Sequence, residues 1–146
     1  MWWFKHPPST RPRLTASLSL VAVNWLFSVS YRFPEQLVQR FIRPEGVRVS
    51  IVQYLETLGP VWIVGFSLSA IVLTYAVISR RALVTAHVLG GMIWAGYSTA
   101  LLFGVFASDP IGSILLPGCA VVITVFHLSL SDAYSENLPP RKEKIE

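Results

Sequence analysis

The stretch that decides the fold is 61–79, VWIVGFSLSAIVLTYAVIS, which has no charged side chain. From residue 60 to residue 131 the chain carries only three charged side chains, Arg80, Arg81 and Asp109. These residues separate three apolar stretches, 61–79, 82–108 and 111–130. Each is about as long as the ~20 residues that a helix needs to cross a hydrocarbon core. Since backbone polar groups in lipid must be satisfied within the segment itself, all three are predicted to be transmembrane helices.

The composition is typical of an integral membrane protein. Hydrophobic residues make up 53% of the chain and charged residues 14%, which is roughly half the charged share of a soluble domain. The net charge of +4 comes mainly from Lys and Arg at the ends of predicted spans, so a lipid bilayer is the expected partner and nucleic acid is not. Cys119 is the only cysteine, which excludes an intramolecular disulfide. We expect a single transmembrane domain over residues 1–146.

A fourth span is predicted at 14–30, LTASLSLVAVNWLFSVS, although it is less apolar than the other three. As a helix packed against its neighbours, it would turn its serines and Asn24 toward protein. The alternative is the core of a signal peptide, because basic residues precede it and Ser28-Val29-Ser30 loosely imitates a cleavage site. Serine substitutes poorly for the alanine of such sites, so a retained span is preferred. The predicted fold class is an all-α polytopic membrane protein with a four-helix transmembrane bundle.

Two further features of the sequence are an amphipathic segment before the second span and a proline within the last span. The segment 34–58 is amphipathic, with apolar residues on one helical face before Pro44 and on another face after it. This pattern predicts two short helices in the membrane interface, and a solvated helix that caps the bundle is the alternative. Inside the last span, Pro117-Gly118 predicts a kink.

Basic residues in the short flanks predict the orientation. With both termini in the cytoplasm, eight of the twelve Lys and Arg lie inside, among them Arg80 and Arg81 between the second and third spans. The turn at 108–111 lies outside and has none. This distribution agrees with the positive-inside rule, so the predicted location is the cytoplasmic (inner) membrane, with 131–146 as a cytoplasmic tail.

Three polar side chains within the predicted spans form a candidate site, because such groups are costly in lipid unless they are satisfied. His87 and His127 are expected at similar depth on adjacent antiparallel helices, and Asn24 lies deeper. Two facing histidines can hold a haem iron or relay a proton. The simpler alternative is a hydrogen bond from each imidazole to backbone, headgroup or water, and an interhelical hydrogen bond for Asn24. No metal or nucleophile motif is present in the sequence, so neither a cofactor nor enzyme activity is expected.

Small residues repeat along the third span and predict close helix packing. They form two adjoining faces, and the members chosen as packing or oligomerisation residues are Gly91, Ala95, Gly96, Ala100 and Gly104. Small residues at this spacing let two helix backbones approach closely. One face can serve the internal packing and the other a second copy or another membrane protein. The alternative is that both faces are internal.

The order of residues in the second half of the chain resembles a family of small multi-span, holin-like proteins encoded near the lysis genes of actinobacterial phages. The resemblance covers residues 60–131 and rests on Arg81, Ala86-His87, Trp94-Ala-Gly-Tyr97, Gly104 and His127. It implies a host-membrane protein that oligomerises and permeabilises the inner membrane, or helps another holin to do so. The family has no catalytic residues to carry over, and the segment 34–58 has no counterpart in it.

Three functions therefore remain open at the level of the sequence. The first is a holin-like assembly that rearranges to expose the polar face of the first span, Ser17, Asn24 and Ser28, to an aqueous lumen. The second is an accessory or scaffold subunit of a larger membrane complex. The third is a haem- or quinone-binding redox protein that uses His87 and His127.

Overall fold

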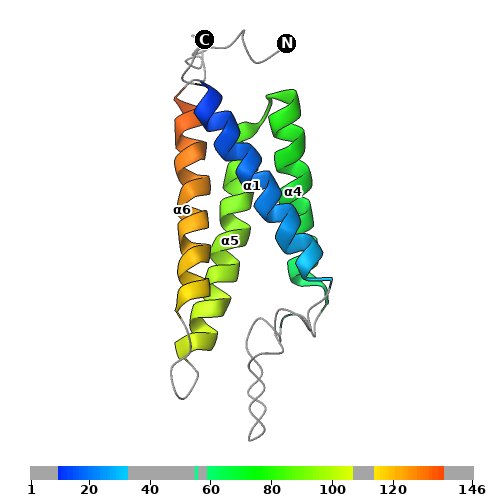
Figure 1. Ribbon diagram of the computed structural model, residues 1–146, viewed down its shortest axis with the longest axis vertical. Coiled ribbons are helices and arrows are strands. Elements are labelled where there is room, and N and C mark those ends of the chain that lie inside the picture. The colour runs from blue at the N-terminus through cyan, green and yellow to red at the C-terminus, as the bar shows by residue number, and fades with distance from the viewer. Residues whose placement is uncertain (1–9, 33–54, 56–58, 107–113, 137–146) are drawn as a thin grey trace, which may run out of the picture.

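The computed structural model describes residues 10–32, 55, 59–106 and 114–136, and these residues form four helices. The helices are α1 (Thr10–Ser30), α4 (Val61–Ser79), α5 (Leu83–Phe106) and α6 (Leu115–Ser135). They lie side by side and alternate in direction, so that α1 begins and α6 ends at the same end of the molecule (Figure 1). No strand occurs among the described residues. The prediction of an all-α fold is confirmed.

Three of these helices, α4, α5 and α6, are long and apolar enough to cross a membrane. They coincide with the stretches predicted at 61–79, 82–108 and 111–130, although residues 107–113 lie outside the described part of the chain. This supports the prediction of an integral membrane protein. The segment predicted at 14–30 is also helical, within α1.

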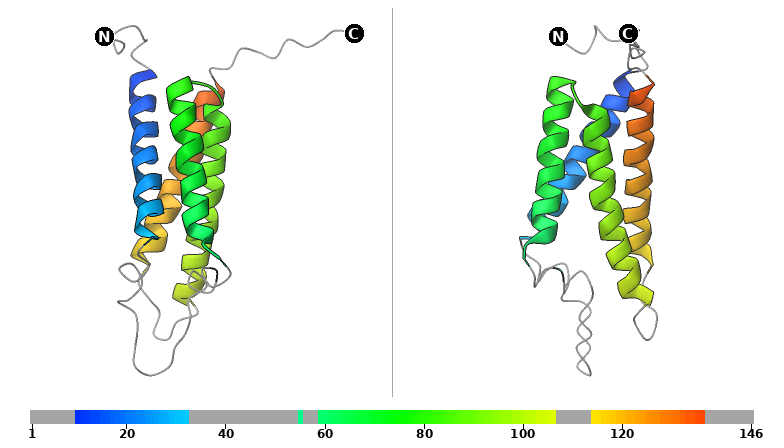
Figure 2. Two further views of the ribbon diagram at one scale, coloured as in Figure 1. Left: turned by 90° about the vertical axis from the view of Figure 1, so that its right-hand side faces the viewer. Right: turned by 180° about the vertical axis from the view of Figure 1, so that it is seen from behind.

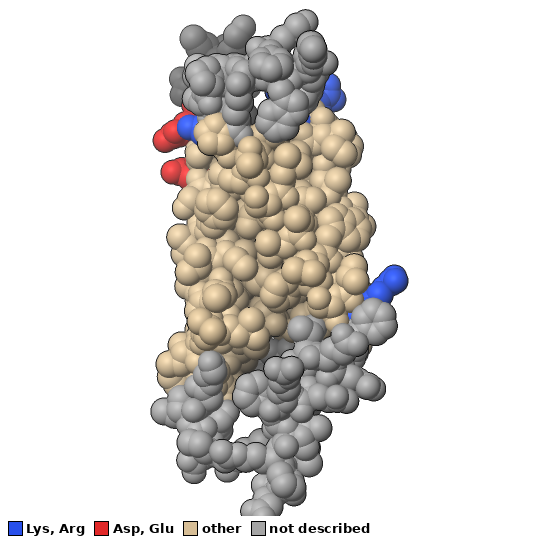
Figure 3. Space-filling model, viewed as in Figure 1, with Lys and Arg blue, Asp and Glu red and all other residues tan. Residues whose placement is uncertain are grey.

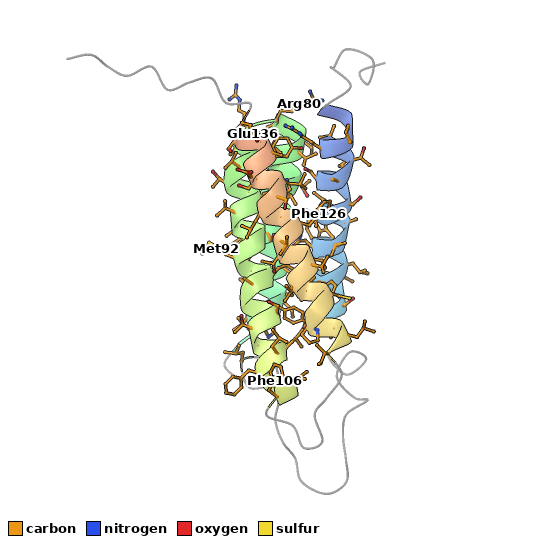
Figure 4. The ribbon with its side chains drawn as sticks, turned by 90° about the vertical axis from the view of Figure 1, so that its left-hand side faces the viewer. Arg80, Met92, Phe106, Phe126 and Glu136 are labelled. Atoms are coloured by element: carbon orange, nitrogen blue, oxygen red, sulfur yellow. The ribbon has the colours of Figure 1, made fainter. Side chains whose placement is uncertain are left out.

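The outer surface of the helices is apolar between two charged ends. Side chains such as Met92 (67% exposed) and Phe106 (66% exposed) point away from the other helices. Figure 4 shows Arg80 and Glu136 near one end, Phe106 near the other, and Met92 between them on the outside of α5. On the face drawn in Figure 3, the Lys, Arg, Asp and Glu side chains of the described residues lie only near the two ends. Such a surface suits contact with hydrocarbon and not with water.

The connection between α4 and α5 reverses the chain within three residues. Arg80 has φ 56° and ψ 27°, which ends α4 in the left-handed conformation, and Ala82 has φ 55°. Left-handed φ is unfavourable for a residue with a Cβ atom, so this turn stores backbone strain. At the other end, α4 begins directly after Pro60, a residue whose ring is compatible with the start of a helix.

The last helix is displaced along the chain from its predicted range. It begins at Leu115 and runs to Ser135, past the predicted end at residue 130 and into the segment expected to be a solvated tail. Pro117 consequently lies in the first turn, where a backbone N–H has no partner within the helix. The Pro117-Gly118 pair, which was predicted to kink the last span, thus lies at the start of its helix, where the proline removes no hydrogen bond.

The four helices pack as two close antiparallel pairs. The most extensive interfaces join α5 to α6 and α1 to α4, while α4 also packs against α5. By contrast, α1 and α6 come near one another at only a few positions, and no close backbone approach occurs between α1 and α5. Figure 2 shows α1 crossing the molecule obliquely beside α4. The space between α1 and the α5–α6 pair is therefore filled by long side chains.

Aromatic side chains fill the half of this space that lies toward the end of α1 and the start of α4. The cluster comprises Phe27, Tyr31, Trp62, Phe66, Trp94 and Tyr97. The centroids of neighbouring rings are as close as 4.7 Å. Most of these rings meet edge to face or tilted, which are arrangements that aromatic pairs prefer. The Tyr31 hydroxyl donates to the Tyr97 hydroxyl at 2.8 Å. Leu55, which belongs to the predicted amphipathic segment, packs against this cluster, and the rest of 34–58 lies outside the described residues.

Candidate functional site

The other half of the interior combines an apolar cluster around Leu20, Leu73 and Leu130 with buried polar side chains. Several of these polar residues recur with an aromatic one at a spacing of seven residues on three helices. The pairs are Ser17 and Asn24 on α1, His87 and Trp94 on α5, and His127 and Tyr134 on α6. Seven residues make almost two helical turns, so both members of each pair lie on the same face of their helix. All six are buried except Tyr134, which is half-buried. We call this set the polar network.

The polar network forms one continuous series of contacts. From the end at which α6 terminates, the Tyr134 hydroxyl lies 3.0 Å from Ser17 Oγ, which lies 2.9 Å from His87 Nε2. The Nδ1 atoms of His87 and His127 are 3.2 Å apart. His127 Nε2 is 3.5 Å from the side-chain nitrogen of Asn24, and the Trp94 indole N–H donates to Asn24 Oδ1 at 3.3 Å. The series therefore joins α1, α5 and α6, whereas α4 takes no part in it.

The orientation of the Asn24 amide follows from two partners whose roles cannot change. The Trp94 indole nitrogen can only donate, and the Leu20 carbonyl oxygen can only accept. Asn24 Oδ1 therefore faces Trp94, and Asn24 Nδ2 donates to the Leu20 oxygen at 2.8 Å. The second hydrogen of the same amide points toward His127 Nε2. Every polar atom of Asn24 thus has a partner, as burial requires.

At the opposite end of the polar network, one further contact ties α1 to α6, since the Arg13 guanidinium donates to the carbonyl oxygen of Ala133. Within α1, the Ser17 hydroxyl donates to the Arg13 carbonyl oxygen at 3.0 Å. The Tyr134 ring stacks on the His87 ring, with centroids 5.6 Å apart and an interplanar angle of 16°. The polar network therefore begins close to the end of the molecule at which α1 starts and α6 terminates.

Gly90 makes room for the histidine pair. A Cβ atom at this position would overlap the imidazole ring of His127, and its nearest contacts would be ring atoms. Gly90 and His127 lie on the two helices with the most extensive interface. The glycine therefore sets how close the His127 ring can come to α5, and with it the distance between the two imidazoles.

This geometry does not suit a haem. The two imidazoles hydrogen-bond directly through their Nδ1 atoms, and the Nε2 atoms contact Ser17 and Asn24. A porphyrin could not lie between rings whose centroids are 5.3 Å apart and whose nitrogens are in contact. A tetrahedral metal could join two nitrogens at this separation, but it needs further ligands. Within the described residues no group of three or more His, Cys, Asp or Glu side chains supplies them.

The small residues of α5 divide between the inside and the outside of the molecule. Gly91 is buried against α6, where an added Cβ would lie 3.2 Å from a Leu128 methyl group, and Ala100 is also buried. Gly96 is exposed, with no atom within 4 Å of an added Cβ, whereas Ala95 and Gly104 are half-buried. Internal packing therefore uses Gly91, and Gly96 faces outward.

The sequence analysis singled out His87, His127 and Asn24, and the structure brings these three side chains together. The remaining members of the polar network were not predicted as partners of the histidines. Ser17 was assigned to a polar face of the first span, Trp94 to a family-like motif, and Tyr134 to a tail. The seven-residue spacing shared by three helices is the signal that could have joined them, because it aligns all six residues on facing helix surfaces.

Comparisons with known proteins identify no relative for this chain. No protein-family model, curated protein or solved structure matches it. The assignment of function therefore rests on the geometry described above.

Proposed function

We propose that the chain is a four-span protein of the inner membrane, with both termini in the cytoplasm, that assembles with other copies and permeabilises the membrane in the manner of a holin. The observation that carries this proposal is the inverted polarity of α1. Its buried face contains Ser17, Asn24 and Ser28, whereas Leu26 (63% exposed) and Val29 (53% exposed) point outward. A helix of this kind can lie in lipid while the four helices are packed together. It can line an aqueous lumen once its polar face separates from the other helices.

The placement of α1 supports the fourth span. It runs antiparallel to α4 and shares an extensive interface with it. Because α4 is long and apolar enough to cross a membrane, a helix packed along it occupies the same layer. The basic residues support the orientation, since Arg13, Arg80 and Arg81 lie at the end where α1 begins and α6 terminates.

Assembly is proposed to use the outward surface of α5 around Gly96, with the half-buried Ala95 beside it. A glycine on a lipid-facing helix lets a second helix approach closely. The polar residues of α1 remain inside each copy until the assembly rearranges and turns them toward a lumen. An accessory subunit of a larger complex would use the same surface to bind a different protein.

Inducible expression in a bacterium, with membrane potential followed by a dye, tests this function. Wild-type protein should cause abrupt depolarisation after a delay. Gly96→Ile should abolish or strongly delay it, because the branched side chain keeps neighbouring copies apart. Gly118→Ile is the matched control, since neither glycine has an atom within 4 Å of an added Cβ, and Gly118 lies on α6.

Two outcomes would count against the proposal. If wild-type protein reaches the membrane in full amount and no depolarisation follows, permeabilisation is wrong, and co-purification of a fixed partner would identify an accessory subunit instead. If depolarisation occurs and both isoleucine variants behave alike, the surface around Gly96 does not mediate assembly.

A further inference from the structure

We propose that the polar network is a latch that holds the α1–α4 pair against the α5–α6 pair, and that it is a directed chain of hydrogen bonds whose direction is set by Trp94. As the device that would keep the polar face of α1 closed, the latch rests on the proposed function. The arrangement of its hydrogen bonds can be tested independently of that function.

The attachment of α1 differs between the two sides of the molecule. Its extensive interface is with α4, and it reaches α5 and α6 through the polar network at one end and through apolar side chains such as Phe27 and Leu20. Ser17 bonds to His87 and Tyr134, and Asn24 bonds to His127 and Trp94. The hydrogen bond between Ser28 and Ser67, at 2.6 Å, stays within the α1–α4 pair. Loss of the contacts made by Ser17 and Asn24 therefore loosens one pair from the other, while the His87–His127 and Ser28–Ser67 hydrogen bonds within the pairs remain.

The two pairs are connected along the chain by one short turn. It contains Arg80 and Ala82, both with left-handed backbone conformations, and α4 also packs directly against α5. A turn of this kind can change its φ and ψ angles while the helices on either side stay rigid. The polar network lies in the half of the interior nearest this turn, and the aromatic cluster, which also contacts both pairs, lies in the other half, with Trp94 in both sets. Opening of the latch at the turn therefore requires the α4–α5 contacts to shift as well.

The direction of the chain follows from Trp94 one step at a time. Trp94 fixes the Asn24 amide, so Asn24 Nδ2 donates to His127 Nε2, which must be unprotonated. The proton of His127 is then on Nδ1 and is donated to Nδ1 of His87. The proton of His87 is consequently on Nε2 and is donated to Ser17 Oγ. Ser17 donates to the Arg13 carbonyl and accepts from Tyr134, which completes its capacity.

The hydrogen bonds of such a directed chain depend on one another, so they form or break together. From Trp94 to Ser17 each donor points toward the end at which α6 terminates, and Tyr134 donates to Ser17 from that end. Reversal at one member would bring two donors or two acceptors face to face at the next. Buried polar groups are stabilising when every partner is present and costly when one is missing. Separation of the two pairs leaves donors and acceptors on both surfaces, which water would then satisfy. The same residues thus favour a dry closed state and a hydrated open state.

Nitrogen-15 NMR of full-length His6→Gln protein in lipid bilayers tests the hydrogen-bond assignment, because only His87 and His127 then contribute imidazole signals. Protonated and unprotonated ring nitrogens are well separated in chemical shift. We expect His87 to carry its proton on Nε2 and His127 on Nδ1. Replacement of Trp94 by Phe should release the Asn24 amide and produce a mixture of tautomers at His127. Identical tautomers on both histidines in the Trp94-containing protein would overturn the assignment.

The time of depolarisation tests the latch, with Ser17→Ala and Ser19→Ala as a pair. Both serines lie on α1, but Ser17 bonds to His87 and Tyr134 of the other pair, whereas Ser19 is exposed and its hydroxyl bonds to the Thr15 carbonyl of its own helix. Ser17→Ala should advance depolarisation several-fold in time, and Ser19→Ala should leave it near the wild-type time. Equal effects of the two variants would refute the latch. If no protein depolarises the membrane while the NMR assignment holds, the proposed function fails and the directed chain stands.

Discussion

At the scale of single residues, the interior is organised by a few atoms whose chemical roles are fixed. The Trp94 indole can only donate a hydrogen bond, and this restriction orients Asn24 and through it the histidine pair. Gly90 contributes by having no side chain where the His127 ring lies. The histidines could be recognised in the sequence because histidine is rare in apolar helices. Gly90 could not, because the sequence does not show that a histidine ring packs against it.

Gly90→Ala should destabilise the protein although alanine favours helix formation. The added Cβ would overlap the His127 ring, and forcing an atom into a packed site costs about 1–3 kcal/mol. Gly96→Ala on the same helix is the control, because its Cβ meets open space and the substitution should be neutral or stabilising. Thermal unfolding in detergent measures both. Equal midpoints for the two variants would show that the His127 ring moves aside without cost.

At the scale of helices, the sequence predicted apolar segments well and their ends less well. The residues of α4 match the predicted stretch because Pro60 and Arg80 bound it on both sides. The range of α6 was misplaced because its amphipathic last turns, which contain Asp132, continue the helix beyond the apolar run. The polarity of α1 made it the weakest predicted span, and three of its polar residues, Ser17, Asn24 and Ser28, are buried against other helices.

The turn between α4 and α5 gives a prediction at this scale. Ala82 has φ 55°, a conformation that costs a residue with a Cβ atom about 1 kcal/mol. Ala82→Gly should therefore raise the unfolding midpoint slightly. Ala22→Gly, at an exposed position within α1, should lower it, because glycine weakens a helix interior by about 1 kcal/mol. A lower midpoint for Ala82→Gly would show that the turn is not strained.

At the scale of the whole molecule, two helix pairs enclose an interior with an aromatic cluster in one half and, in the other, the polar network beside a smaller apolar cluster. This division could not be predicted from the sequence, because it depends on the oblique crossing of α1 and on which faces of three helices meet. It explains how a helix with several polar side chains can lie among apolar helices. It also gives each residue proposed to line water a hydrogen-bond partner on another helix, on α5 or α6 for Ser17 and Asn24 and on α4 for Ser28.

The central claim of this account is that α1 crosses the membrane as a fourth span, because the enclosed polar network and its release both depend on it. Reporters active on only one side of the membrane, fused to the two ends of the full-length chain, test this claim directly. Four spans place both ends on the cytoplasmic side, and the N-terminal reporter stays attached to the protein. Ends on opposite sides, or loss of the N-terminal reporter by cleavage, would contradict the account.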